Sequence, residues 1–340
     1  MGLLALFAGS PAGAENAAVT LAPEPARARS RVAIACDASA TSAFKPDPER
    51  VTALLARAIL SFSGKSTLGE AWSTFASSND VVGIKVFSAP GPNSGTRPAL
   101  VAAAVKGLTA AGVSPKNIII WDRDYDDLRT AGFVQLAAEL GVRVESTRGA
   151  GYDEAASYDS PIIGNLVWGD FEFGQKGEQV GRRSFVTKLV TKEITRIVSV
   201  TPLLNQNVAG VAGHLFGLAF GSVDNTIRFE RDRDILNQAV PEICALEALG
   251  DKVALCITDA LICQYQGGER SLLHYSAALN EIRISRDPVA LDVLSIAELE
   301  RQRQLAEIPE IKPNRELYEN AALVELGQCD LKRIQIERVP

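Results

Sequence analysis

The hydrophobic positions of this chain follow two alternating patterns. Short apolar runs are typical of buried strands, whereas apolar residues three and four apart indicate amphipathic helices. In the N-terminal part these patterns predict strands at 31–36, 81–87, 117–122 and 142–145, and helices at 48–60, 98–111 and 128–140. Because strands that alternate with helices usually form a parallel sheet with right-handed crossovers, we expect that arrangement here.

The pattern changes in the middle of the chain. Residues 149–181 hold seven glycines and five aromatic residues without a clear period, which predicts a long functional loop or a small antiparallel excursion. After this stretch, strands are expected at 195–201, 253–259, 281–284 and 331–339, and helices at 209–218, 235–249, 287–304 and 314–326. The predicted fold class is α/β, a mostly parallel or mixed sheet flanked by helices, with a glycine-rich excursion in the middle. Residues 31–340 would form this domain, whole or as two sub-lobes, 31–148 and 182–340.

Composition narrows the range of partners. Hydrophobic residues make up 46% and charged residues 22% of the 340, an ordinary balance for a globular protein. The net charge is −6 and the Lys and Arg residues are scattered, so no overall basic field would attract nucleic acid. A local anion pocket needs only a few cationic groups, so a small-molecule ligand stays open. No apolar segment is long enough to span a bilayer, and the sequence does not indicate an oligomeric state.

The N-terminus resembles the end of a signal peptide. An apolar run at residues 3–8 is followed by Ala12-Gly13-Ala14, an Ala-x-Ala cleavage pattern before Glu15. Residues 15–30 have the composition of a linker, so residues 1–30 are expected to lie outside the fold. We therefore expect a periplasmic or secreted protein. The basic region that normally opens a signal peptide is missing, and the alternative is a flexible Ala-rich tail on a cytoplasmic protein.

Cysteine and histidine are sparse. None of the five cysteines forms a Cys-x-x-Cys pair, so the sequence has no iron–sulfur or zinc motif, and the cofactor is unknown. Cys36, Cys256 and Cys263 lie among apolar residues and are expected to be buried thiols. Cys256 and Cys263 could instead form a disulfide if the chain is exported. The two histidines, His214 and His274, are too few for a His-rich metal centre.

Lys85 lies in the middle of an apolar run that predicts a buried strand. Burial of an ammonium group is costly, so such a lysine normally has a partner or a chemical role. In a parallel α/β sheet, ligands collect at the carboxyl ends of the strands, where Lys85, Asp122 and Asp259 are expected. We predict these three as catalytic residues, the two carboxylates orienting the lysine or acting as acid and base. The alternative is a structural salt bridge between Lys85 and either Asp122 or Asp259.

The loop at residues 88–97 is the second candidate. It connects a predicted strand to a helix, with Thr96 as the expected N-cap and Arg97 in the first turn. A cation near a helix N-terminus is disfavoured by the helix dipole, so we expect an anion between Arg97 and the helix end. The alternative is that Arg97 points to solvent. The loop is not a G-x-G-x-x-G fingerprint, which disfavours a nicotinamide-dependent dehydrogenase.

Further polar residues are expected at the same edge of the sheet. The predicted ligand-binding residues are Thr96, Arg97, Arg123, Asn205, Asn207, His214 and Asp292. Arg123 would help Lys85 and Arg97 to neutralise an anionic ligand. The alternative for His214 is that it only packs, on a glycine-rich helix. Asp287, before Pro288, is expected to cap a helix.

Taken in order, these segments resemble the domain-of-unknown-function family 362. The resemblance covers most of residues 31–340 and rests on Val-Val-Gly-Ile-Lys85, Thr96-Arg97-Pro98, Ile-Ile-Ile-Trp121-Asp122-Arg123, Ala209-Gly210-Val211, Thr258-Asp259-Ala260, Asp287-Pro288-Val-Ala-Leu-Asp292 and Asp330-Leu-Lys-Arg-Ile334. It implies an α/β fold, frequent export and, in some relatives, an attached iron–sulfur domain. It implies no agreed substrate.

The chain departs from the family pattern at three places. The family usually has a Lys and a His just before Ala209, where this chain has Leu204-Asn205-Gln206-Asn207. A Lys-Asn pair is often present where Phe216-Gly217 stands, and a His commonly follows the Thr where this chain has Arg97. Either the ligand differs or the activity is reduced.

Two functions follow as alternatives. The first is an exported α/β protein, with catalysis left open, that binds a small anionic or metal-associated ligand at the strand ends. The second is a non-catalytic accessory or ligand-binding protein that has lost the family's polar site residues. Convergence of Lys85, Asp122 and Asp259 in one deep pocket would favour the first, and a filled site would favour the second.

Overall fold

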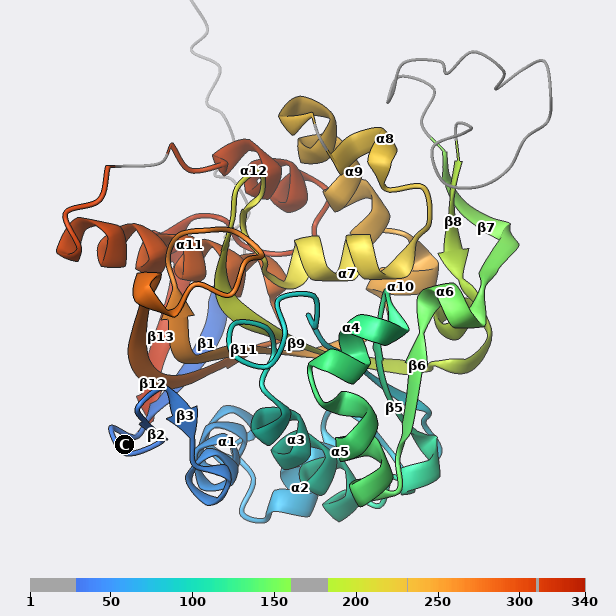
Figure 1. The fold of residues 1–340 in the computed structure, drawn as a ribbon. Helices are drawn as coiled ribbons and strands as arrows, with labels where there is room; N and C mark the ends of the chain where they lie inside the picture. The colour runs from blue at the N-terminus through green and yellow to red at the C-terminus, as the bar shows by residue number, and fades with distance from the viewer. Residues whose placement is uncertain (1–28, 160–182, 231, 310–311, 340) are drawn as a thin grey trace, which may run out of the picture.

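A nine-stranded sheet runs through the centre of the molecule (Figure 1). The computed structural model describes residues 29–159, 183–230, 232–309 and 312–339. The strand order is β13-β1-β12-β11-β9-β4-β5-β6, with β10 paired to β9. Along this order β12 is antiparallel to both its neighbours and the other strands run parallel to one another, which confirms the predicted α/β class with a mostly parallel sheet.

The strands of this sheet are β1 Ser30–Cys36, β4 Val82–Lys85, β5 Ile118–Asp122, β6 Arg143–Ser146, β9 Arg196–Gln206, β10 Gly210–Val211, β11 Val253–Gln264, β12 Ser276–Ser285 and β13 Ile334–Val339. Two small hairpins pair β2 Thr41–Ser42 with β3 Lys45–Pro46, and β7 Tyr152–Asp159 with β8 Arg183–Thr187. Strands from both considered sub-lobes, 31–148 and 182–340, interleave in the one sheet.

Helices cover both faces of the sheet. They are α1 Pro48–Ser63, α2 Leu68–Ser73, α3 Pro98–Ala110, α4 Tyr125–Thr130, α5 Phe133–Leu140, α6 Thr147–Ala150, α7 His214–Ser222, α8 Ile227–Glu230, α9 Arg233–Cys244, α10 Glu247–Gly250, α11 Pro288–Leu305 and α12 Arg315–Leu323. In Figure 1, α1, α2, α3 and α5 lie below the sheet, and α7, α9, α11 and α12 lie above it.

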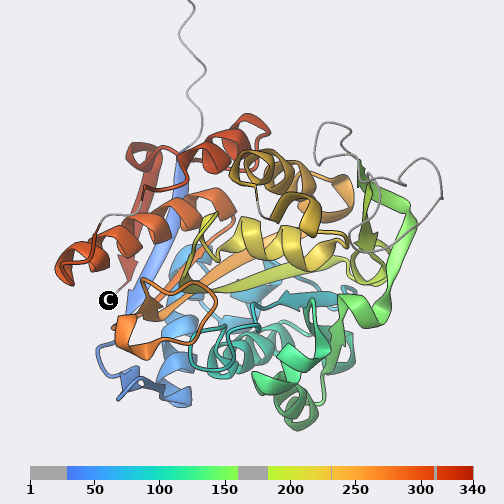
Figure 2. The ribbon, with the colours of Figure 1, turned by 45° about the horizontal axis from the view of Figure 1, so that its top comes forward.

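The strands are apolar on both faces because each face carries its own core. In β5, Ile118 and Ile120 pack with α1 and α3, whereas Ile119 and Trp121 pack with α7 and α9 on the other side. Side chains alternate between faces along a strand, so a continuous apolar run supplies both cores. Helix α7 lies over the centre of the sheet, between α11 and the β7–β8 hairpin (Figure 2).

Several predicted boundaries differ from the structure. The helix expected at 128–140 is divided into α4 and α5 by Gly132, which has φ +89°. Strands β9, β11 and β12 are longer than expected. The end of β9 pairs with β10, and β11 and β12 pair with each other as far as Gln264 and Ser276. The glycine-rich stretch begins with β7, and its residues 160–182 lie outside the described part. Asp287 caps α11 as predicted, its carboxylate accepting from Ala290 N at 2.8 Å.

The cysteine predictions are only partly confirmed. Cys256 and Cys263 are buried thiols, but Cys36 is exposed. The considered disulfide between Cys256 and Cys263 is absent, and both thiols are free. They lie seven residues apart on β11, about 23 Å along an extended strand, which is too far to bridge. Among the residues with described structure, no helix is long and apolar enough to cross a membrane. Of the signal-like segment and linker predicted at 1–30, residues 1–28 lie outside the described part, and Ser30 begins β1.

Candidate functional site

Lys85 and Asp122 form a buried ion pair at the ends of β4 and β5. Lys85 Nζ donates to Asp122 Oδ1 at 2.7 Å and to the Val86 carbonyl at 2.6 Å. The second carboxylate oxygen, Oδ2, accepts from Ser88 N at 2.7 Å and from Ser88 Oγ at 2.6 Å. Both charges are therefore satisfied within the chain. Of the two carboxylates considered as partners for Lys85, the structure selects Asp122.

The space around Lys85 is filled. Its ammonium group lies 5.5 Å from the centre of the Trp121 ring. Helix α7 also passes so close that a Cβ on Gly221 would lie 2.0 Å from Lys85 Cε. The Lys85 side chain is 1% exposed. A substrate could not reach Nζ unless α7 moved.

Arg97 and Asp259 form a second, separate buried pair. Arg97 is the N-cap of α3, and its backbone N–H donates to Asp259 Oδ2 at 3.0 Å. Its Nη1 donates to Asp259 Oδ1 at 2.9 Å. The position expected for an external anion, between Arg97 and the helix end, is thus occupied by a carboxylate of β11. This internal anion explains why a cation is tolerated at a helix N-terminus.

Thr96 is not the N-cap that the sequence predicts. Its hydroxyl accepts from Phe87 N at 2.9 Å and donates to the Val200 carbonyl at 2.8 Å. It therefore ties the start of the 88–97 loop to β9, and the cap position belongs to Arg97.

His214 and Asp292 form a third buried polar group, beneath α7. His214 Nδ1 lies 2.8 Å from Ser199 Oγ, and Nε2 lies 3.2 Å from Thr258 Oγ1. Asp292 Oδ1 accepts from His214 N at 2.7 Å, and Oδ2 accepts from Leu215 N at 3.0 Å. Burial lowers the pKa of His214 to about 3 and raises that of Asp292 to about 7. The hydroxyl partners and low pKa support a neutral packing histidine.

Arg123 lies at the surface end of β5, apart from the two ion pairs. Its Nη1 donates to Thr226 Oγ1 at 2.9 Å. Several carboxylates act on the same region: the pKa of Glu269 is raised chiefly by burial and further by Glu230 and Asp122. These carboxylates disfavour an external anion beside Arg123.

Asn205 and Asn207, at the end of β9, meet an arginine that the sequence analysis missed. Asn205 Nδ2 donates to Asn207 Oδ1 at 2.9 Å, and Asn205 Oδ1 accepts from Arg303 Nη2. Both asparagines line a small cavity together with Arg303. Arg303 stands in an Arg-Gln-Arg-Gln run that is typical of a solvated helix face. The signal that could have found it is its spacing, because Arg303 lies four residues after the buried Leu299.

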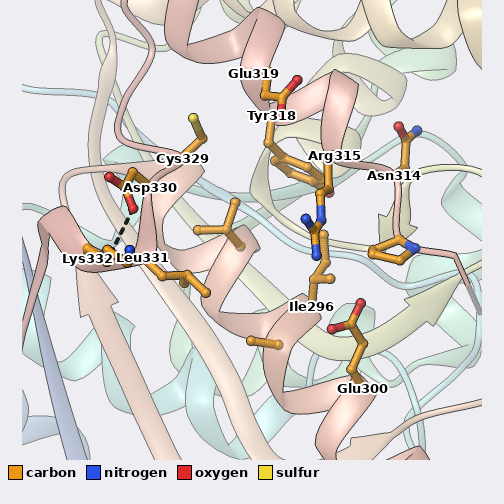
Figure 3. Close-up of a pocket in the computed structure, with 13 residues that line it drawn as sticks. Ile296, Glu300, Asn314, Arg315, Tyr318, Glu319, Cys329, Asp330, Leu331 and Lys332 are labelled. Carbon is orange, nitrogen blue, oxygen red and sulfur yellow. Dashed lines mark hydrogen bonds between the residues drawn. The ribbon is translucent and has the colours of Figure 1, made fainter. Parts of the chain in front are cut away.

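A larger groove of about 450 Å³ lies beside this cavity, between α11, α12 and residues 329–332 (Figure 3). Figure 3 shows Arg315 of α12 and Glu300 of α11 projecting into the same part of the groove. On the far wall Asp330 accepts from the backbone N–H of Lys332 at 3.0 Å. The groove and the cavity share Ile296, Pro313 and Asn314. None of the predicted site residues lines the groove.

The structure thus divides the predicted site. It brings together Lys85 with Asp122, Arg97 with Asp259, His214 with Asp292, and Asn205 with Asn207. It does not bring Lys85 and Asp259 into one pair. Among the described residues, no group of three or more His, Cys, Asp or Glu side chains is placed to hold a metal ion.

Comparison with known proteins adds little. No family model matches the chain, and no curated protein matches it. One solved structure to which the chain has a distant likeness is a Thermotoga maritima protein, a target of the Northeast Structural Genomics Consortium. The likeness has a TM-score of 0.42 at 10% sequence identity and covers 77% of this chain and 60% of that one, less than two thirds of its length. The resemblance to the domain-of-unknown-function family 362 stays a prediction.

Proposed function

We propose that this chain is a non-catalytic ligand-binding protein whose strand-end charges serve the fold. The observation that carries this proposal is that Lys85 and both oxygens of Asp122 are hydrogen-bonded within the chain and covered by α7. A lysine that acts as a base or nucleophile must touch its substrate, usually as the neutral amine. Lys85 is instead hydrogen-bonded to Asp122 and to the Val86 carbonyl, and α7 covers it.

The open space lies elsewhere, which supports ligand binding away from Lys85. The α11–α12 groove, at about 450 Å³, falls within the range of small-molecule sites. Its lining combines apolar side chains such as Val293 and Ile296 with charged ones such as Arg315 and Glu300. The adjoining cavity reaches the carboxyl end of β9, where ligands of α/β proteins collect.

The departures from the family pattern also favour a non-catalytic protein. The resemblance implies no agreed substrate, and the small anionic or metal-associated ligand is predicted from the charged residues at the strand ends. The missing Lys and His before Ala209 favour the accessory alternative. The proposal also includes that the chain is a member of that family and that the protein is exported. Export rests on the sequence of residues 3–14.

The test is native mass spectrometry of Lys85→Met and wild-type protein purified from its own host, together with urea denaturation. A structural pair predicts that a co-purifying ligand is retained in Lys85→Met, while the free energy of unfolding falls by about 3–5 kcal/mol because Asp122 is left buried and unpaired. The same spectra give the mature mass, and cleavage before Glu15 would remove the fourteen residues ahead of it.

The matched control is Lys106→Met, which removes an exposed lysine of α3 and should leave both readouts unchanged within about 0.5 kcal/mol. If Lys85→Met lost the ligand but kept its stability, the proposal would be refuted, and Lys85 would be a binding or catalytic residue.

A further inference from the structure

Four cationic side chains are almost completely buried in the described part of the chain. Lys85, Arg97, Arg283 and Arg303 are 1, 2, 5 and 5% exposed. The first three each lie within 3 Å of a carboxylate oxygen, on Asp122, Asp259 and Glu281 respectively. Arg303 makes no ion pair with any described residue. Because a buried charge is costly unless it is paired, Arg303 is the exception that calls for a partner.

The contacts of Arg303 leave donors unused. Its Nε donates to the Tyr265 carbonyl at 2.8 Å, and its Nη2 donates to Asn205 Oδ1. Both acceptors are neutral. A guanidinium carries five N–H donors, and Nη1 has no hydrogen-bond partner among the described residues. Glu300, one turn earlier on α11, acts on Arg303 electrostatically but not as an ion-pair partner.

The unused donors belong to a side chain that lines a cavity with no carboxylate among its described lining residues. The cavity has a volume of about 10 Å³, roughly one water-sized sphere. Arg303 and Lys312 contribute its cations, and Asn205, Asn207 and Asn314 contribute its amides. Among the described residues, no Asp or Glu lines it. The lining is therefore polar and positive, and the space fits a single atom.

We propose that this cavity binds a small anion, either a free halide or one anionic oxygen of a carboxylate, with Arg303 as the main contact. The inference rests on the proposed function, since it assigns the ligand-binding role to the end of β9 rather than to Lys85. A water molecule would satisfy the donors but would leave the charge unbalanced. The neighbouring α11–α12 groove shares Ile296, Pro313 and Asn314 with the cavity and is where the body of a carboxylate ligand would lie.

Thermal unfolding of the full chain in sodium chloride or sodium acetate tests the proposal, with bulky isethionate holding the ionic strength constant. Binding to the folded state alone raises the unfolding temperature with anion concentration. The wild type should show this rise, and Arg303→Met should lose it. Arg301→Met, an exposed arginine on the same helix that pairs with Glu298, should keep it. A response to chloride alone would identify a halide site, and a response to acetate would identify a carboxylate site.

A second variant and a second probe guard against misfolding of Arg303→Met. Lys312 is exposed, so Lys312→Gln should fold normally while shifting the half-saturating anion concentration upward. Bromide soaked into crystals of the wild type should give an anomalous peak beside Arg303 Nη1. No anion-dependent shift in the wild type, or titrations that superimpose for wild type, Arg303→Met and Lys312→Gln, would overturn the proposal. Because these measurements do not involve Lys85, their failure is distinguishable from failure of the proposed function.

Discussion

At the scale of single residues, the partner of a buried charge decides its interpretation. Lys85 and Arg303 are both almost fully buried, yet Lys85 lies 2.7 Å from Asp122 whereas Arg303 contacts only neutral groups. The sequence marked Lys85 because it interrupts an apolar run. Arg303 was missed because its neighbours along the helix are also polar, and only its spacing from the buried Leu299 indicates burial. Burial of a lysine was therefore predictable, but its partner required the fold.

Asp292 gives a pH-dependent prediction at this scale. Burial raises its pKa to about 7, above the value of about 3.9 expected in the unfolded chain. The folded state then binds a proton more tightly, so the contribution of Asp292 to stability is present below pH 4 and is lost as pH rises to about 7. Burial lowers the pKa of His214 to about 3, so its contribution to the free energy of unfolding rises with pH between about pH 3 and 6.5, opposite to that of Asp292.

Asp292→Asn isolates this effect, because the asparagine carbonyl oxygen can still accept from one of the two α7 backbone N–H groups, and the loss of the other hydrogen bond is the same at every pH. Relative to the wild type, the free energy of unfolding of the variant should rise by up to about 4 kcal/mol between pH 4 and 7, since the wild type must bury a charge at the higher pH. Urea denaturation across this range measures the difference. A difference that stays constant with pH would show that Asp292 does not titrate there.

At the scale of elements, α7 is positioned by glycines spaced four residues apart. A Cβ on Gly213 would lie 2.2 Å from Asp292 Oδ1, and one on Gly221 would lie 2.0 Å from Lys85 Cε. Gly217, between them, has more room, with Thr201 Cγ2 at 3.5 Å from its Cβ position. These positions share one face of the helix, so the backbone of α7 can approach the sheet closely enough to close over Lys85.

Gly221→Ala should therefore destabilise the protein by about 1–3 kcal/mol, because the added methyl group displaces the Lys85 side chain from Asp122. Gly217→Ala is the matched control one turn earlier. It meets only ordinary contacts and gains helix propensity, so its stability should be unchanged or higher by up to about 1 kcal/mol. Equal stabilities of the two variants in urea would contradict the close packing of α7 on Lys85.

The helices and strands that could be predicted from the sequence are those marked by local signals. Helices α1, α3 and α11 begin at Pro48, Pro98 and Pro288 as the sequence indicates, because proline suits the first turn. The division of the 128–140 helix at Gly132 was missed, since an isolated glycine within a helical pattern is often tolerated. The extensions of β9 and β11 were missed because they depend on pairing with β10, which begins four residues after β9, and with β12, the next strand after β11. The apolar runs do not reveal this pairing.

At the scale of the whole molecule, alternating apolar patterns predicted the α/β class, because both sheet faces must be covered by helices. The candidate site was harder, since several elements contribute to it. Lys85 and Asp122 end β4 and β5 as the sequence predicts, whereas Asp259 lies within β11, which continues to Gln264. The pairing of carboxylates with cations depends on the fold. Lys85 meets Asp122 because β4 lies beside β5, and Arg97 meets Asp259 because the N-terminus of α3 approaches β11.

The central claim is that these strand-end charges hold the fold together. The Lys85–Asp122 pair connects β4 to β5, and the Arg97–Asp259 pair connects α3 to β11. A double-mutant cycle of Lys85→Met and Asp122→Asn, measured by urea denaturation, tests this claim most directly. We expect each single variant to lose several kcal/mol and the double variant to lose less than their sum, with a coupling energy of about 2–3 kcal/mol. Small, additive losses with a coupling energy near zero would contradict the account and favour a Lys85 kept for chemistry.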